Sequence, residues 1–199
     1  KDSQIPLVLG TVPKIDYPSV QQVNPSSACV PQPPAYVTAG PDDGFRNGSR
    51  VIPVGSLEGS TNGERVYRFF VNNGFTPEQA CGWVGNFAVE SFIAIDPTAF
   101  NSAGGGQGAF GIAQWRGVRQ TALREWAGST GQDYRTLEAQ LGFVLHELQT
   151  TERTANAQVR SAGSAAAAAR AVEAYYERSG GSKVAERVFY AEDALARYR

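Results

Sequence analysis

The stretch TPEQACGWVGNFAVES, residues 76–91, decides the fold because it has every mark of a complete amphipathic helix. Thr76 can cap the helix, Pro77 suits the first helical position, and Gln79 can close a capping box onto the Thr76 backbone. An apolar face repeats at helical spacing through Ala80, Trp83, Val84, Phe87 and Ala88, with Ser91 in register. We therefore predict a helix whose apolar face lies against a protein core.

Glu90 lies on the apolar face of this predicted helix. It follows Trp83 by seven residues and Phe87 by three, so at about 100° per residue its carboxylate lies beside both rings. Apolar surroundings remove water from a carboxylate, disfavour its charged form and raise its pKa. A carboxyl group of that kind can hold a proton near neutral pH and donate it as a general acid. The alternative is a helix-end glutamate that only binds backbone amides.

The overall composition excludes several classes of protein. The 199 residues suffice for one well-cored domain with an extension, and they include 18 basic and 19 acidic side chains. This near balance gives no electrostatic basis for binding nucleic acid or a membrane surface. No apolar run approaches the roughly 20 residues of a membrane-spanning helix. The chain contains no methionine, so we expect it to be a product of a longer polypeptide.

The sequence offers little for metal, cofactor or cysteine chemistry. Cys29 and Cys81 have neither metal-ligand spacing nor a disulfide framework, and we expect Cys81 to be a buried apolar residue. His146 is the only histidine, and its position off the apolar face of its predicted helix indicates a solvated side chain. A Ser-His-Asp hydrolase or a zinc amidase therefore lacks its residues, and we expect no cofactor and no metal. The neighbouring Glu147 borders the apolar face, and we favour a surface position over a role in orienting nearby groups.

The composition changes near residue 60. Residues 1–60 contain nine of the eleven prolines and no helical periodicity, with short strands indicated at 5–9 and 36–37. A segment of this kind cannot bury a core of its own, so we predict an extended linker that gains order from partners. Residues 61–199 form the second predicted unit.

From Thr61 onward the pattern becomes helical. Thr61 and Glu64 predict a second capping box, and Gly74 predicts the end of that helix. Further helices are predicted at residues 117–127, 134–150, 164–178 and 183–198. A glycine-rich stretch at residues 104–108 predicts a hairpin or an exposed tongue, and it lacks the lysine of a phosphate-binding loop. The predicted fold is mainly α, with one short β tongue.

Three motifs follow one another in a fixed order. They are Glu90-Ser91, then Asp96-Pro97-Thr98-Ala99 and, after the glycine-rich gap, Gly111-Ile112-Ala113-Gln114-Trp115. In this order they resemble the lysozyme-like superfamily that includes the lytic transglycosylases. Arg119 and the later segments at 137–141 and 175–178 make the chain most similar to the phage tail lysozyme domain, over residues 62–180. Residues 1–60 lie outside this resemblance, although residues 5–16 faintly resemble part of a tail baseplate hub.

The resemblance implies a lysozyme-like catalytic domain in which Glu90 is the acid that cleaves the β-1,4 glycan strand of bacterial peptidoglycan. It also implies that Gln114 hydrogen-bonds the sugar and that Tyr175 or Tyr176 approaches the leaving sugar. The tongue with Gln107 would line the substrate groove, because glycines let a backbone close on a glycan.

Each of these substrate contacts has a structural alternative. Gln114 could be an amide that ties the tongue to the helices, and we favour core packing for Tyr175 and Tyr176. Trp115 is expected to anchor the core, as are Trp83 and Trp126, although its place at the end of the tongue would also let it stack on a sugar.

A second carboxylate is harder to identify from the sequence. Hydrolysis by two carboxylates needs a partner roughly 5 to 9.5 Å from the acid. Asp96 is the nearest candidate in sequence, but in the resembled pattern this position is a turn residue. A single glutamate permits attack by water, as in a lysozyme, or attack by the 6-hydroxyl of the substrate, as in a lytic transglycosylase. The sequence leaves both open.

The resemblance further implies a location and partners. The enzyme would be carried in the phage virion, at the tail tip or baseplate, and would act on the bacterial cell wall. Peptidoglycan would be the substrate, and residues 1–60 would bind tail or baseplate hub proteins, with no role for nucleic acid or a membrane. The alternative is a catalytically inert structural or glycan-binding tail component, and we favour the enzyme.

Overall fold

The first helix starts where the sequence places a capping residue. The computed structural model describes residues 56–103, 106 and 108–199, and α1 (Asn62–Asn72) opens this part. The Thr61 hydroxyl accepts a hydrogen bond from the Glu64 backbone N–H at 3.1 Å. The Glu64 carboxylate binds Ser60 instead of the Thr61 backbone, so only half of the predicted capping box forms. Gly74 follows the helix with a φ of 78°, a conformation that glycine adopts without strain.

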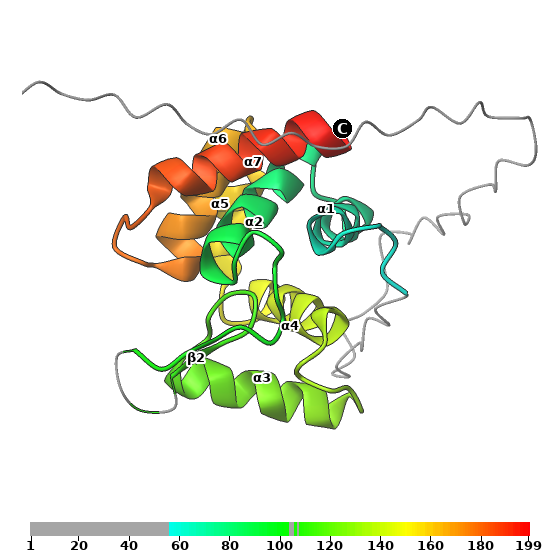
Figure 1. The fold of residues 1–199 in the computed structure, drawn as a ribbon, viewed down its shortest axis with the longest axis vertical. Coiled ribbons are helices and arrows are strands. Elements are labelled where there is room, and N and C mark those ends of the chain that lie inside the picture. The colour runs from blue at the N-terminus through cyan, green and yellow to red at the C-terminus, as the bar shows by residue number, and fades with distance from the viewer. Residues whose placement is uncertain (1–55, 104–105, 107) are drawn as a thin grey trace, which may run out of the picture. The chain divides into compact units, whose positions relative to one another are not determined.

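The helix α2 (Pro77–Glu90) matches its prediction most completely. Thr76 and Gln79 form both hydrogen bonds of the capping box. Trp83 and Phe87 are fully buried, and the Trp83 ring stacks on Phe70 of α1 with 4.9 Å between the ring centroids. Packed against α1, α6 and α7, this helix is central to the core, as Figure 1 shows.

The remaining elements confirm a mainly α fold. They are β1 (Phe100–Asn101), β2 (Ala109–Phe110), α3 (Gly117–Ser129), α4 (Leu137–Gln149), α5 (Arg153–Arg160), α6 (Ala165–Ala171), the π-helix η1 (Val172–Glu177) and α7 (Val184–Tyr198). The helix predicted over 164–178 is therefore divided into α6 and η1. The helix α5 was not predicted from the sequence, because it buries only Ala155 and Val159, too few apolar residues to reveal its period.

The predicted tongue begins and ends in a minimal antiparallel sheet. Phe100 pairs with Phe110 and Asn101 pairs with Ala109, across the glycine-rich stretch. Gly108 has a φ of 72°, and a Cβ there would lie 2.7 Å from the Asn101 carbonyl oxygen, so only glycine fits. Gln107 lies outside the described residues.

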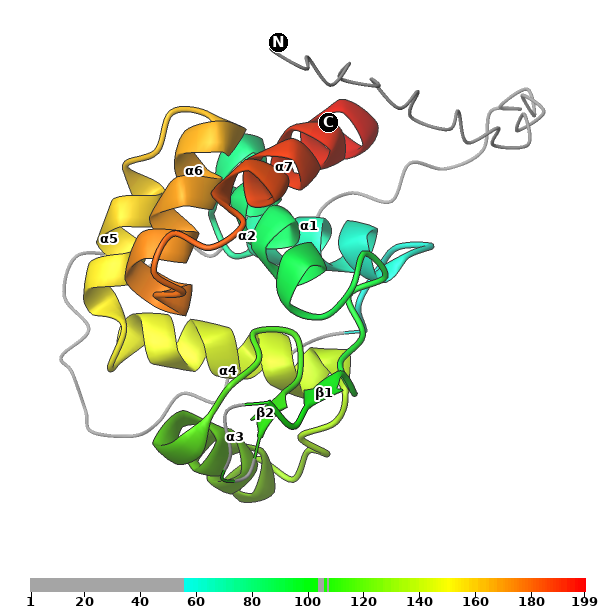
Figure 2. The same cartoon turned by 60° about the vertical axis from the view of Figure 1, so that its left-hand side comes forward.

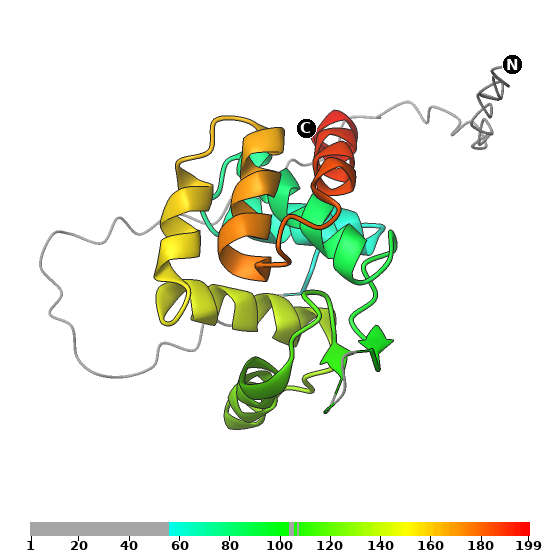
Figure 3. The same ribbon diagram turned by 90° about the vertical axis from the view of Figure 1, so that its left-hand side faces the viewer.

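The elements of the domain form two groups with α4 between them. In Figures 2 and 3, α1, α2, α5, α6 and α7 lie on one side of α4, and α3 and the β1–β2 hairpin lie on the other. The C-terminal end of α2 points toward the second group in each view. This end of α2 carries Glu90.

Two predictions concern parts of the chain beyond these elements. The extended segment, with its strands at 5–9 and 36–37, falls on residues 1–55 and lies outside the described residues. Within the described ranges, no helix combines the length and apolar character that crossing a bilayer requires.

Gly85 permits the close approach of α2 and α7, so we expect Gly85→Ala to destabilise the domain. A Cβ at this position would clash with the Arg187 carbonyl oxygen and lie 2.8 Å from the Ala191 backbone nitrogen. Backbone atoms cannot move aside singly, so the helices must separate, at a cost of about 1–3 kcal/mol. Gly128→Ala in α3 is the matched control, since its Cβ would meet nothing within 4 Å and alanine favours a helix by up to about 1 kcal/mol. Chemical denaturation measures the free energy of unfolding of both variants. Equal changes for Gly85→Ala and Gly128→Ala would contradict the close packing of α2 against α7.

Candidate active site

Glu90 is the last residue of α2 and stands at the edge of the core. The helix stops there because Phe92 has a φ of 66° and the Ser91 hydroxyl donates a hydrogen bond to the Phe87 carbonyl at 2.8 Å. The preceding turns of α2 are buried, whereas the Glu90 side chain is 19% exposed. A carboxyl group at this position is held by a rigid helix and still reaches solvent.

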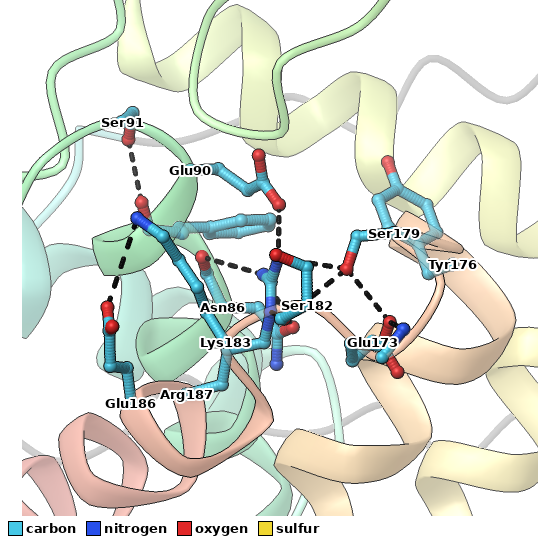
Figure 4. A network of polar contacts seen from close by, with 12 residues as sticks. Asn86, Glu90, Ser91, Glu173, Tyr176, Ser179, Ser182, Lys183, Glu186 and Arg187 are labelled. Atoms are coloured by element: carbon cyan, nitrogen blue, oxygen red, sulfur yellow. Dashed lines mark hydrogen bonds and ion pairs between the residues drawn. The ribbon is translucent and has the colours of Figure 1, made fainter.

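A buried guanidinium faces Glu90. Arg187 of α7 is 2% exposed, and its Nη2 donates to Glu90 Oε1 at 2.5 Å, as Figure 4 shows. Within the described residues, the second carboxylate oxygen of Glu90 has no hydrogen-bond partner. The helical spacing predicts aromatic surroundings for Glu90 but gives no sign of this ion pair.

Arg187 is fixed by several elements at once. Its Nη1 donates to Asn86 Oδ1 at 3.1 Å, and its Nε donates to the Ser182 carbonyl at 3.3 Å. Asn86 is itself held, because its side-chain amide donates to the carbonyl oxygens of Gly82 and Ala169. The guanidinium therefore has a defined position next to the Glu90 carboxylate.

The loop between η1 and α7 folds back onto this arginine. Glu173 of η1 accepts hydrogen bonds from the Ser179 hydroxyl and the Gly181 backbone N–H, both at 2.9 Å. Ser179 also lies 3.4 Å from Arg187 Nη2, between Arg187 and Glu173 in Figure 4. These contacts connect η1 to the Glu90–Arg187 pair.

Glu147 forms a second buried cluster, and the surface position expected for it is wrong. The residue is 3% exposed on α4, where its two oxygens accept hydrogen bonds from Arg119 at 2.7 and 2.9 Å. They also accept from Trp115 Nε1 at 3.1 Å and from the Tyr176 hydroxyl at 2.6 Å. A carboxylate with this many donors can be buried, because charge-assisted hydrogen bonds replace its hydration. These hydrogen bonds fit the alternative that was less favoured for Glu147, a role in orienting neighbouring side chains.

Two of the aromatic residues predicted to contact substrate lie inside the domain. Tyr176 is 0% exposed and Trp115 is 1% exposed, and both donate to Glu147. Burial, and next the negative charge of Glu147, raise the pKa of Tyr176 well above its usual value, so the phenol remains a donor. Core packing fits both residues, and stacking of Trp115 on a sugar does not fit its burial. Tyr175 is 41% exposed and can be reached from solvent.

Gln114 and Asp96 have structural roles that leave their predicted functions untested. Gln114 has a φ of 47°, and its side-chain amide donates to the carbonyl oxygens of Ala99 and Gly111 at 3.2 and 3.0 Å. Asp96 Oδ1 accepts from the backbone N–H and the hydroxyl of Thr98, which is the geometry of a turn residue. Sugar binding by Gln114 and a second-carboxylate role for Asp96 stay predictions.

Glu177 is a candidate that the sequence analysis did not select. It is the last residue of η1 and is half-buried, and its Oε1 is buried without a hydrogen-bond partner in the described part of the chain. Burial, and next the charge of Glu90, raise the pKa of Glu177 well above its usual value. The periodicity of an ordinary helix could not place this side chain, because Glu177 lies in a π-helix, whose hydrogen bonds run from i to i+5 and depart from ordinary helical spacing.

Comparison with protein families identifies the whole helical domain. A family model described as phage tail lysozyme matches residues 61–198. The match begins at the capping residue of α1 and extends into α7, so it includes Arg187, which lies beyond the resemblance found from the sequence motifs. The chain therefore belongs to the phage tail lysozyme family, virion-associated enzymes that cleave the peptidoglycan of the bacterial cell wall.

Proposed function

We propose that this domain cleaves the β-1,4 glycan strand of peptidoglycan with Glu90 as the general acid. The observation that carries the proposal is the position of the Glu90 carboxyl group at the exposed end of a buried helix. One oxygen is held by Arg187, and the other has no partner within the described residues. A general acid needs such an oxygen within hydrogen-bond reach of the atom that it protonates.

Arg187 supports proton donation through the charge that develops on Glu90. As the glycosidic bond breaks, its electron pair stays on the leaving oxygen, and that oxygen takes the proton from Glu90. The carboxyl group becomes a carboxylate in the same step. A guanidinium already in place at 2.5 Å stabilises that charge without reorganisation, which lowers the barrier.

Two reactions are compatible with this step. They differ in the nucleophile that attacks the anomeric carbon and therefore in the product. The anomeric carbon takes its new bond either from water or from the 6-hydroxyl of the same sugar. Water gives reducing ends, and the 6-hydroxyl gives anhydro ends. Among the described residues, nothing around Glu90 favours one nucleophile, so the proposal covers a lysozyme and a lytic transglycosylase.

Digestion of purified sacculi tests this proposal. We expect the protein to solubilise them and to release muropeptides whose ends are of one kind, reducing or anhydro, as mass spectrometry would show. Sacculi that bind the protein and stay intact would instead indicate an inert glycan-binding component.

We further propose that residues 1–60 mount the enzyme on hub proteins of the tail tip or baseplate. Their proline-rich composition, without helical periodicity, supports a segment that gains order from partners. In limited proteolysis, the free chain should be reduced to a resistant fragment that begins near Thr61, whereas assembled particles should protect the segment. Cleavage at the same rate in both states would contradict the mounting role.

A further inference from the structure

A buried amide connects three helices one turn before Glu90. Asn86 of α2 is fully buried, and its side-chain nitrogen donates to the Gly82 carbonyl at 2.8 Å and to the Ala169 carbonyl of α6 at 2.9 Å. Its side-chain oxygen accepts a hydrogen bond from Arg187 of α7 at 3.1 Å. A buried amide costs free energy unless it is hydrogen-bonded, and here both N–H groups and the oxygen have partners.

The partners of Asn86 fix the orientation of its amide. Carbonyl oxygens only accept hydrogen bonds and a guanidinium only donates them, so the site needs two N–H donors on one side and an acceptor on the other. An ionised aspartate of similar size has no donor and would turn a negative charge toward the carbonyl oxygens of Gly82 and Ala169. The asparagine oxygen is therefore held toward Arg187.

Two glycines of α2 bring the neighbouring helices within reach of this amide. A Cβ at Gly82 would lie 2.7 Å from the backbone carbonyl carbon of Ala168 and 2.9 Å from the Ala169 nitrogen, both in α6. A Cβ at Gly85 would lie 2.8 Å from the Ala191 backbone nitrogen of α7. Asn86 follows directly, and its hydrogen bonds join the same helices that the glycines let approach.

The contacts form a continuous chain from α6 to the candidate general acid. The Ala169 carbonyl accepts from Asn86, the Asn86 oxygen accepts from Arg187 Nη1, and Arg187 Nη2 donates to Glu90 Oε1 at 2.5 Å. Figure 4 shows the guanidinium bonded to Asn86 on one side and to Glu90 on the other. The position of the guanidinium at Glu90 thus depends on the buried amide.

The other acceptors hold Arg187 less closely. The Ser182 carbonyl lies 3.3 Å from Nε and the Ser179 hydroxyl 3.4 Å from Nη2, and both belong to the loop between η1 and α7. The side-chain oxygen of Asn86 is nearer, at 3.1 Å, and it belongs to a buried helix. All of these acceptors are neutral, so the charge of the guanidinium remains directed at Glu90.

We propose that Asn86 is a positioning residue for glycan cleavage, which holds the Arg187 guanidinium against Glu90 before charge develops there. This inference rests on the proposed function, in which Arg187 stabilises the carboxylate that Glu90 becomes as it gives up its proton. A donor that is fixed in advance needs no reorganisation during the reaction. Asn86 acts through Arg187 and does not itself contact the Glu90 carboxyl group.

Steady-state kinetics on short glycans of peptidoglycan sugars test this role. In Asn86→Ala the guanidinium loses its closest neutral acceptor, and we expect kcat to fall by about 10- to 100-fold, the size of loss that follows a displacement of up to about 1 Å. KM should stay unchanged, because the lost stabilisation is realised only in the transition state and Arg187 is buried away from a bound glycan.

Asn86→Ser covers the case in which the alanine variant does not fold. The serine hydroxyl can donate to the Gly82 carbonyl, as Ser91 donates to Phe87 in the same helix at 2.8 Å, while the shorter side chain withdraws the acceptor from Arg187. We expect the same loss in kcat at constant KM. Circular dichroism would establish the temperature at which each variant is folded.

Gln79→Ala is the matched control. Gln79 is a buried amide in the first turn of α2, and it donates to the carbonyl oxygens of Arg160 and Ala162 at 2.7 and 3.3 Å and accepts from the Thr76 N–H at 3.0 Å. Its truncation removes as many hydrogen bonds as Asn86→Ala but does not affect Arg187. We expect a loss of stability with an unchanged kcat. An equal loss of kcat in both variants would overturn the positioning role.

A double-mutant cycle with Arg187→Met shows whether Asn86 acts through the arginine. In that background the amide has no guanidinium to hold, so adding Asn86→Ala should change kcat by less than about 2-fold. Gln79→Ala should likewise have no further effect on kcat. Losses that multiply in the double variant of Asn86 and Arg187 would show that Asn86 affects the reaction by another route, and would overturn the inference.

The side-chain N–H groups of Arg187 give a readout that is independent of activity. Buried, hydrogen-bonded N–H groups are protected from exchange with water. In nitrogen-15 NMR, exchange of the Arg187 side chain should be faster in Asn86→Ala than in the unmodified protein, and unchanged in Gln79→Ala. Unchanged exchange in both variants would overturn the inference.

The two proposals fail in different ways. If Glu90→Gln still cleaves sacculi, the proposed function falls and the catalytic role of Asn86 falls with it, even if Arg187 exchanges faster in Asn86→Ala. If Glu90→Gln is inactive while Asn86→Ala and Asn86→Ser keep the kcat of the unmodified protein, only the role of Asn86 is overturned.

Discussion

Replacing Glu90 with glutamine is expected to slow the cleavage of sacculi by about 100- to 10,000-fold, the usual contribution of a general acid. The amide has nearly the same shape and still accepts the hydrogen bond from Arg187, but it has no proton of suitable acidity to donate. Because the buried guanidinium loses its counterion, some loss of stability should accompany the loss of activity. Turbidity loss of sacculi, followed at a temperature where circular dichroism shows a folded variant, measures the effect.

Glu186→Gln is the matched control for this substitution. Glu186 directly precedes Arg187 on α7, but its side chain is 58% exposed and its contact with Lys183 is a surface pair at 4.0 Å. Surface pairs of this kind contribute little, so activity and stability should stay close to those of the unmodified protein. Equal rates for Glu90→Gln and Glu186→Gln would remove Glu90 from the mechanism.

Glu147→Ala is expected to destabilise the domain by about 3–5 kcal/mol, the range seen when one partner of a buried ion pair is removed. The substitution leaves Arg119 without its closest counterion, and it leaves the Trp115 N–H and the Tyr176 hydroxyl buried without an acceptor. Denaturant titration measures the free energy of unfolding. Glu125→Ala, an exposed position on α3, is the control and should change that free energy by less than about 0.5 kcal/mol. A loss of similar size at both positions would contradict the role given to the Glu147 cluster.

The sequence predicted the elements whose signals are local. The Thr76 cap, Pro77 and the apolar repeat of α2 lie within one stretch of chain, and the structure reproduces that helix with both hydrogen bonds of its capping box. The hairpin followed from glycines between two short apolar segments. Cys81 is buried, as expected of an apolar residue, and His146 is exposed, as its position off the apolar face of its predicted helix indicated.

The sequence did not predict features that depend on residues far apart in the chain. Glu147 borders an apolar face, and only its partners on α3 and η1, 28 and 29 residues away, make its burial possible. Arg187 lies 97 residues from Glu90, and no local pattern connects the two. Glu177 ends a π-helix, where ordinary helical spacing fails.

The most direct test of Glu90 as the proton donor varies the leaving group of the substrate. A general acid is needed when the leaving oxygen is a poorly acidic sugar hydroxyl, and it is not needed when the leaving group departs without a proton. Short glycans of peptidoglycan sugars would be compared with the same glycans carrying a fluoride or dinitrophenyl leaving group, for the unmodified protein and for Glu90→Gln. We predict a large loss for Glu90→Gln on the natural glycan and a rate close to that of the unmodified protein for cleavage of the activated bond. An equal loss on both substrates would show that Glu90 does not act by donating a proton.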